Sequence, residues 1–192
     1  MPKTTLLDQS SILIKERSGL LAQTDSCDLL DGTYLKPIGI VAHESAGLSN
    51  GLRPLLGKAM VTTVLNVYDP GVSLPLLSVR KKAFLRGGRL EILGASDLLY
   101  ATARIETWSL GAGFDFLDGF GHRLGAMKGD WKSGTFTFTL AGGAVLGVVT
   151  RPASTHAAPI TVSLHPECSH PRGMALLLGA ALGLDLAAKG KK

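Results

Sequence analysis

The chain has 192 residues, of which 45% are hydrophobic and 18% are charged, a balance that excludes an intrinsically disordered protein. Its length suits a single domain that buries about 70% of the surface of the unfolded chain. Two cysteines, Cys27 and Cys168, are too few for a disulfide framework. With 20 Lys and Arg against 15 Asp and Glu, the formal net charge is +5, which favours an anionic partner.

The N-terminal residues contain no long apolar run before Asp8, so the sequence predicts no signal peptide. Together with the low cysteine content, this favours a cytoplasmic protein. Residues 6–14 are expected to form the first strand. Because no linker-like stretch divides the chain, we expect residues 1–192 to form one domain.

A hairpin pattern then recurs between residues 28 and 152. The copies are 28–32 with 38–41, 65–71 with 76–80, 90–94 with 100–105, 114–119 with 123–127, and 136–140 with 145–149. The turns near Asp69, Gly94, Asp118 and Ala141 are 25, 24 and 23 residues apart, which is room for two strands and two turns. Asp118 takes a turn position, where an Asp side chain accepts hydrogen bonds from the backbone.

The alternation of residue types is clearest in residues 135–140, where Phe136 and Phe138 share one face and threonines the other. Residues 160–164 repeat this alternation before Pro166. The chain then has about a dozen strands, and closing such a sheet removes its edges. The sequence therefore predicts a mainly β fold, a closed antiparallel barrel of about 12 strands.

Residues 174–188 favour a helix, and this helix would be apolar around its whole circumference. Protein or lipid must therefore surround it. The run spans about 22 Å, which is less than the ~30 Å of a bilayer core. We therefore expect a helix over about 171–188 inside the barrel. Ala175, Gly179, Gly183 and Ala187 form a stripe of small residues that lets the helix approach a wall closely, although the glycine spacing also occurs in membrane helix dimers.

Few polar residues lie in or near this helix, and none of them forms a catalytic or metal-binding motif. A carboxylate inside an enclosed helix is costly, so Asp185 is expected to reach water at the barrel mouth or to pair with a basic residue such as Arg104. His165, Cys168 and His170 are too few for a zinc site and are interpreted as a polar connector. The sequence has no nucleophile elbow, phosphate loop or dinucleotide motif. We therefore expect a non-enzymatic protein with no catalytic residue, metal or cofactor.

Basic residues are concentrated in two places and form the candidate lipid-binding set. Its members are Arg80, Lys81, Lys82, Arg86, Arg89, Lys189, Lys191 and Lys192. Clustered cations attract phosphates of lipid or nucleic acid, whereas the alternative is that they are solvated residues that protect sheet edges. Nucleic acid is not expected, because exposed aromatic residues do not alternate with these cations.

Several segments carry a family resemblance by their order and spacing. They are 68–71 (Tyr-Asp-Pro-Gly) with 77–82, 114–118 with 123–125, 129–131, 136–138, and 177–186. Through them the chain resembles the LURP-one-related and phospholipid scramblase group, which shares the tubby-type fold. The resemblance runs from about residue 6 to residue 188 and implies a closed barrel around a hydrophobic C-terminal helix.

The resemblance also implies a lipid-related activity. Tubby-like members bind phosphoinositides through basic residues, and scramblases are associated with calcium-dependent lipid movement. Residues 164–172 hold one carboxylate, too few oxygen ligands for a calcium loop, so calcium gating is not expected. We expect a non-enzymatic scramblase-like, LURP-one-related protein that binds anionic phospholipid, peripherally on the inner face of a membrane. The alternatives are a module that binds a small apolar ligand or protein partner at the barrel mouth, and active phospholipid scrambling.

Overall fold

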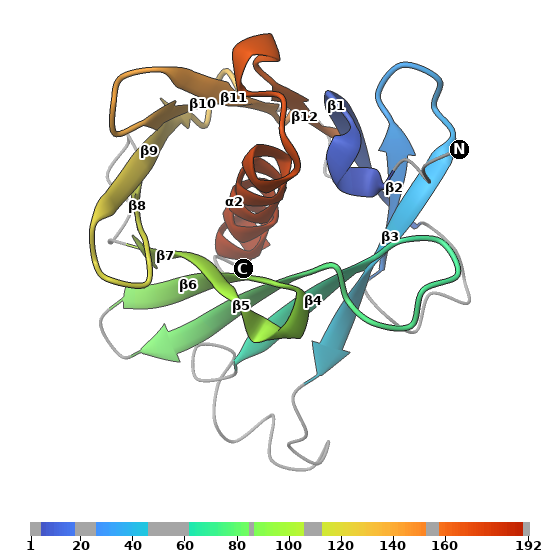
Figure 1. Cartoon of the computed structure of the whole chain (residues 1–192), viewed down its shortest axis with the longest axis horizontal. Helices are drawn as coiled ribbons and strands as arrows, with labels where there is room; N and C mark the ends of the chain where they lie inside the picture. The colour runs from blue at the N-terminus through green and yellow to red at the C-terminus, as the bar shows by residue number, and fades with distance from the viewer. Residues whose placement is uncertain are drawn as a thin grey trace.

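The computed structural model describes residues 5–17, 26–45, 62–84, 87–105, 113–152 and 158–189. In these ranges twelve antiparallel strands close into a barrel, with the C-terminal helix α2 (Pro171–Lys189) inside it (Figure 1). Each strand pairs with its neighbours in the chain, and β12 closes the barrel by pairing with β1. The strands are β1 (Ser11–Glu16), β2 (Cys27–Asp31), β3 (Pro37–Ser45), β4 (Thr63–Tyr68), β5 (Leu77–Phe84), β6 (Gly87–Gly94), β7 (Leu99–Ile105), β8 (Gly113–Leu117), β9 (Arg123–Asp130), β10 (Thr135–Leu140), β11 (Val145–Thr150) and β12 (Ile160–Leu164).

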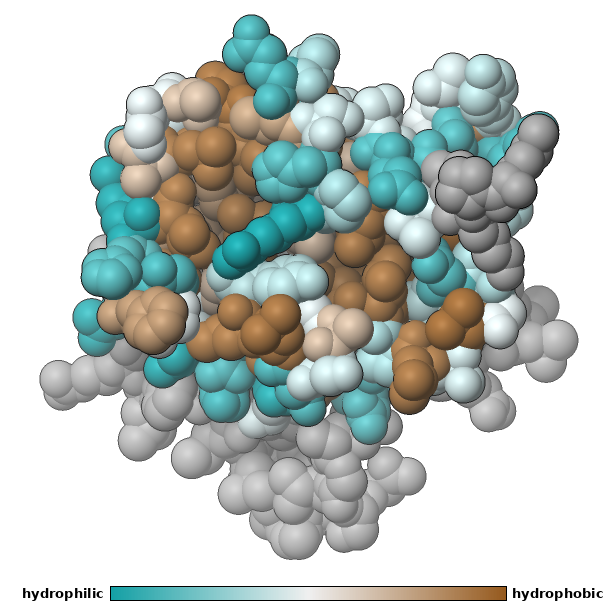
Figure 2. Space-filling view, in the orientation of Figure 1, coloured by the Kyte–Doolittle hydropathy of each residue, from teal (hydrophilic) through white to brown (hydrophobic). Residues whose placement is uncertain are grey.

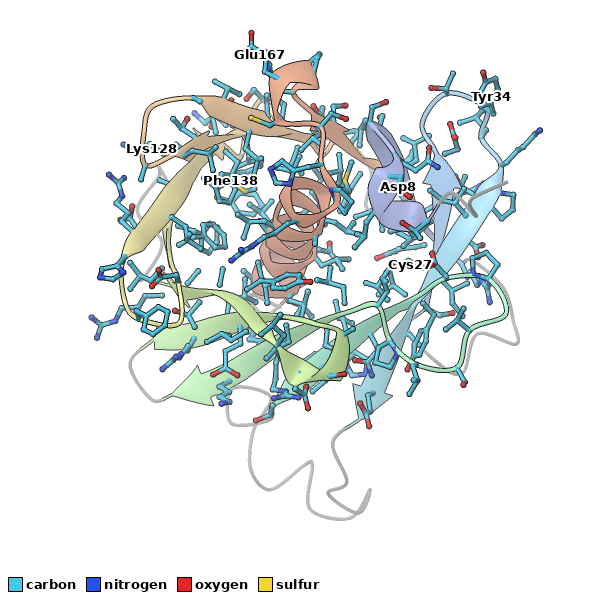
Figure 3. All side chains as sticks on the ribbon, viewed as in Figure 1. Asp8, Cys27, Tyr34, Lys128, Phe138 and Glu167 are labelled. Atoms are coloured by element: carbon cyan, nitrogen blue, oxygen red, sulfur yellow. The ribbon has the colours of Figure 1, made fainter. Side chains whose placement is uncertain are left out.

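The alternation predicted for β10 is confirmed. Phe136 and Phe138 are fully buried, whereas Thr135 is exposed. The ring of Phe138 lies 4.9 Å from that of Phe116 between centroids, and Figure 3 shows Phe138 on the inner side of the wall. The barrel interior is therefore packed with side chains as well as with the helix.

The start of the chain differs from the expected strand over residues 6–14. Leu6–Asp8 forms a 3-10 turn, η1, and β1 begins only at Ser11. The cause is Asp8, whose Oδ2 accepts hydrogen bonds from the backbone N–H and the hydroxyl of Thr5 at 2.8 and 2.9 Å. The N–H of Leu6 donates to Oδ1 of Asp69 at 3.1 Å, and η1 packs against α2. The turn thus closes part of one end of the barrel.

The prediction for Asp118 is confirmed in the β8–β9 turn. Its Oδ1 accepts hydrogen bonds from the backbone N–H groups of Phe120 and His122, each at 2.8 Å. Desolvation acts to raise the pKa of Asp118, but these backbone hydrogen bonds, together with the nearby side chain of His122, outweigh it and lower the pKa below its ordinary value.

The helix α2 is enclosed by the barrel, as predicted. Residues 173–184 are all buried. A Cβ placed on Gly179 would lie 2.7 Å from Cγ2 of Ile92, and one on Gly183 would overlap Leu90. The two glycines of the small-residue stripe therefore lie against β6, where a Cβ would force the side chains of Ile92 and Leu90 to shift. No helix in the described ranges has the length and hydropathy needed to cross a bilayer.

Several large apolar side chains remain exposed on turns at one end of the barrel, the end that holds η1. They are Tyr34 and Leu35 between β2 and β3, Val72 and Leu74 between β4 and β5, Leu98 before β7, and Phe120 between β8 and β9. Hydrophobic residues also gather on the face drawn in Figure 2.

Candidate functional site

The basic residues come together on the outer face of β5, β6 and β7. Side chains alternate along β5, so Val79 is buried inside while Arg80 and Lys82 lie on the outer face. Lys82 stands directly opposite Arg89 on β6, and Arg89 stands directly opposite Arg104 on β7. These three residues, Lys82, Arg89 and Arg104, form a row of opposed cations that we call the basic row.

Among the residues that the structure describes, one carboxylate forms ion pairs with the basic row. Oε1 of Glu91 lies 2.8 Å from Nζ of Lys82 and 3.5 Å from Nε of Arg89, and the Glu91 side chain is only 11% exposed. Like charges directly opposite each other on adjacent strands are destabilising. Since one carboxylate serves two cations, the row keeps an excess of positive charge, and an anion bound there would reduce the repulsion.

Arg104 was missed as a site residue, because its place depends on register. It is exposed and has no ion pair within the described ranges. By contrast, Arg80 is countered, since its Nη2 lies 3.2 Å from Oδ1 of Asp97. The pairing of β6 with β7 shifts at a bulge between Ile92 and Leu93, so residue counting alone does not place Arg104 beside Arg89.

Lys81 does not belong to the basic row. It points into the barrel, where its Nζ donates a hydrogen bond to the backbone carbonyl of Leu186 at 3.2 Å. Burial lowers the pKa of Lys81. The last carbonyls of a helix lack partners within the helix, and the hydrogen bond from Lys81 satisfies one of them at the end of α2. Lys81 therefore contacts the C-terminal end of α2 inside the barrel and does not face an external ligand.

The remaining members of the predicted set are not placed. Arg86, Lys191 and Lys192 lie outside the described residues. Lys189 is the last residue of α2, and its side chain also lies outside the described part of the structure. Their role in lipid binding stays a prediction.

Asp185 pairs with a basic side chain, as one of the two expectations stated, but its partner is Arg151 and not Arg104. Its Oδ1 lies 3.3 Å from Nη2 of Arg151, and the two side chains are 13% and 17% exposed. Arg151 follows inward-facing Val149 by two positions and so lies on the inner side, whereas Arg104 lies on the outer face. The carboxylate is thus compensated by an ion pair inside the barrel.

The segment between β12 and α2 makes the contacts of a connector. Sγ of Cys168 donates to the carbonyl of Val145 at 3.6 Å. Nδ1 of His170 accepts a hydrogen bond from the N–H of Gly173 at 2.9 Å, which caps the first turn of α2. Within the ranges that the structure describes, no group of three or more His, Cys, Asp or Glu is arranged to hold a metal ion.

Comparison with known proteins gives a likeness of fold. No family model matches the chain, and no curated protein matches it. The X-ray structure of a protein from Arabidopsis thaliana is similar, with a TM-score of 0.53 and 14% sequence identity, over 91% of this chain and 90% of that one. At this identity the likeness shows a shared fold and transfers no residue role.

Proposed function

We propose that this chain is a non-enzymatic, scramblase-like and LURP-one-related barrel that binds anionic phospholipid at a membrane surface. The basic row carries the proposal, because it opposes three cations on adjacent strands, of which Lys82 and Arg89 share the carboxylate of Glu91 and Arg104 has no ion pair within the described ranges. The likeness of fold to the Arabidopsis protein extends over 91% of the chain and agrees with the tubby-type fold that the resemblance implies.

The expected binding is weak and reversible. Each basic residue near an anionic membrane surface contributes about 1 kcal/mol, so the basic row contributes about 3 kcal/mol at most. Glu91 offsets part of this attraction. Because dissolved salt screens exposed charges, the attraction should fall as the ionic strength rises.

Peripheral binding is favoured over insertion into the bilayer. The apolar surface of α2 is already buried against the barrel wall, with Leu177 and Leu178 fully inaccessible. Transferring the helix to lipid would expose the interior of the barrel to water, which is costly. Active scrambling through an inserted helix is therefore the less favoured alternative.

Vesicle flotation tests the proposal. The intact protein should float with vesicles of phosphatidylcholine and phosphatidylserine, and less so with phosphatidylcholine alone or at high salt. The variant K82Q/R89Q/R104Q should lose most of this binding. The matched control K15Q/K128Q/K132Q removes the same charge from exposed positions elsewhere on the described surface and should retain it.

Two results would contradict the proposal: unchanged flotation of K82Q/R89Q/R104Q, or an equal loss in both triple variants. Because removing Lys82 and Arg89 leaves Glu91 without its ion pairs, thermal melting must show that the triple variant is folded. Should it unfold, the flotation of the single variant R104E is measured instead, since Arg104 has no ion pair within the described ranges. Its flotation should fall, and unchanged flotation would contradict the proposal.

A further inference from the structure

A cavity lies on the outer face of β2 and β3, beside the connection from β4 to β5. Its volume is about 540 Å³. In Figure 1 this connection runs alongside β3. The apolar lining residues are Pro37, Ile40, Tyr68, Pro70 and Val72. Small-molecule sites in proteins measure about 300–1,000 Å³ and have mostly apolar walls with a few polar groups.

An ion pair supplies polar groups to this cavity. Both Nε and Nη2 of Arg17 donate to the same oxygen of Asp28, Oδ1, the first at 2.8 Å. Among the described residues, Nη1 of Arg17 and Oδ2 of Asp28 have no partner. The side chains are 49% and 33% exposed, so a ligand can reach them. One cationic donor and one anionic acceptor are thus available side by side.

The charges select the kind of ligand. Asp69 also lines the cavity, so two carboxylates stand against one guanidinium. A ligand with only an anionic group is repelled by the two carboxylates, and one with only a cationic group leaves Nη1 of Arg17 without an acceptor. A zwitterion accepts charge-assisted hydrogen bonds from Arg17 through its anionic group and places its ammonium group against Asp28, by a hydrogen bond where the nitrogen carries hydrogen and by charge attraction where it is fully substituted. Tyr68 adds an aromatic surface, on which substituted ammonium groups pack well.

We propose that this cavity binds a small zwitterion with an apolar body. The anionic group lies on Arg17, the ammonium group on Asp28, and the body against Ile40, Tyr68 and Val72. Two sources share this chemistry: a free apolar amino acid, and the headgroup of a zwitterionic phospholipid. The second gains support from the exposed Tyr34 on the adjacent β2–β3 turn (Figure 3). The site shares no residue with the basic row, so the two proposals fail independently.

Calorimetric titration of the intact protein distinguishes the sources. For the amino acid, tryptophan is compared with N-acetyltryptophan, which is only anionic, and tryptophanamide, which is only cationic. For the lipid, monomeric dihexanoylphosphatidylcholine is compared with dihexanoylphosphatidylglycerol. In at least one series the zwitterion should bind about tenfold more tightly than its singly charged analogues. No saturable binding of either zwitterion, or equal binding of the analogues, would overturn the proposal.

Variants then test the position of the site. Arg17→Met removes the guanidinium, and Val72→Trp fills the cavity without touching the ion pair; each should weaken binding about tenfold or more. The matched control is Arg123→Met, because Nε and Nη2 of Arg123 donate to a single oxygen of Asp115 at 3.2 and 3.0 Å, away from the cavity. It should bind normally, as should K82Q/R89Q/R104Q. If Arg17→Met is unfolded, Val72→Trp decides, and unchanged binding by the folded variants would overturn the proposal.

Discussion

The enclosure of α2 predicts a steric clash at Gly179. A Cβ on this residue would lie 2.7 Å from Cγ2 and 3.0 Å from Cγ1 and Cδ1 of Ile92. Carbon atoms in good contact are about 3.5–4.0 Å apart, so Gly179→Val forces an overlap of about 1 Å before its two methyl groups are counted. Ile92 is fully buried and β-branched, which leaves its side chain little freedom to turn away.

The expected loss follows from two opposed effects. Overpacking a core costs about 1–3 kcal/mol, whereas valine is better than glycine in a helix by about 0.4 kcal/mol. Gly179→Val should therefore lower the free energy of unfolding by about 2 kcal/mol, which lowers the Tm by about 4–8 °C in a domain of this size. Urea unfolding followed by circular dichroism measures this loss.

A second substitution makes the test specific to Ile92. Ile92→Ala alone should cost about 2–5 kcal/mol, but it opens room for the valine, so the double variant should lose at least about 1 kcal/mol less than the sum. Gly142→Ala serves as control, because a Cβ there meets nothing within 4 Å. The reasoning is refuted if Gly179→Val is as stable as the parent chain, or if the two losses simply add.

Three further predictions concern charged groups. Burial lowers the pKa of Lys81 from 10.5, so the free energy of unfolding should increase as the pH rises from the lowered pKa to 10.5. Urea titrations at several pH values measure this increase, and Lys81→Met should abolish it. Against the effect of desolvation, backbone hydrogen bonds lower the pKa of Asp118 below 3.8. The difference in free energy of unfolding between the parent chain and Asp118→Ala should therefore be greatest above pH 3.8 and disappear as the pH falls through the lowered pKa. Melts of both proteins at several pH values measure this difference. Arg151→Met removes the cation that pairs with the Asp185 carboxylate and should lower the free energy of unfolding by about 3 kcal/mol in urea titrations, whereas R151M/D185L should lower it less; equal losses would contradict this account of the pair.

The barrel and its helix were predictable because their signals are local. Alternation in β10 assigns Phe136 and Phe138 to the inside, and the absence of a polar face on residues 174–184 requires a helix surrounded by protein or lipid. The error over residues 6–8 is also local in cause. There the carboxylate of Asp8 binds the backbone of Thr5 and forms a turn, although the leucines beside it suit a strand.

The candidate site was only partly predictable, because it depends on register between strands. Charge clustering identified Lys82 and Arg89, but their alignment with Arg104 is fixed by a bulge that no sequence pattern marks. Clustering also included Lys81, although alternation along β5 places it on the inner face with Val79. Where charge and periodicity disagree within a strand, the periodicity determines which way a side chain points.

The most direct test of the account is whether α2 stays inside the barrel when the protein meets a membrane. Hydrogen exchange of the α2 amides should be measured with and without anionic vesicles. Because the helix is enclosed, we expect these amides to exchange only through global unfolding, equally slowly in both samples. Faster exchange in α2 on vesicles, with binding that resists high salt, would contradict the account and favour an inserted helix.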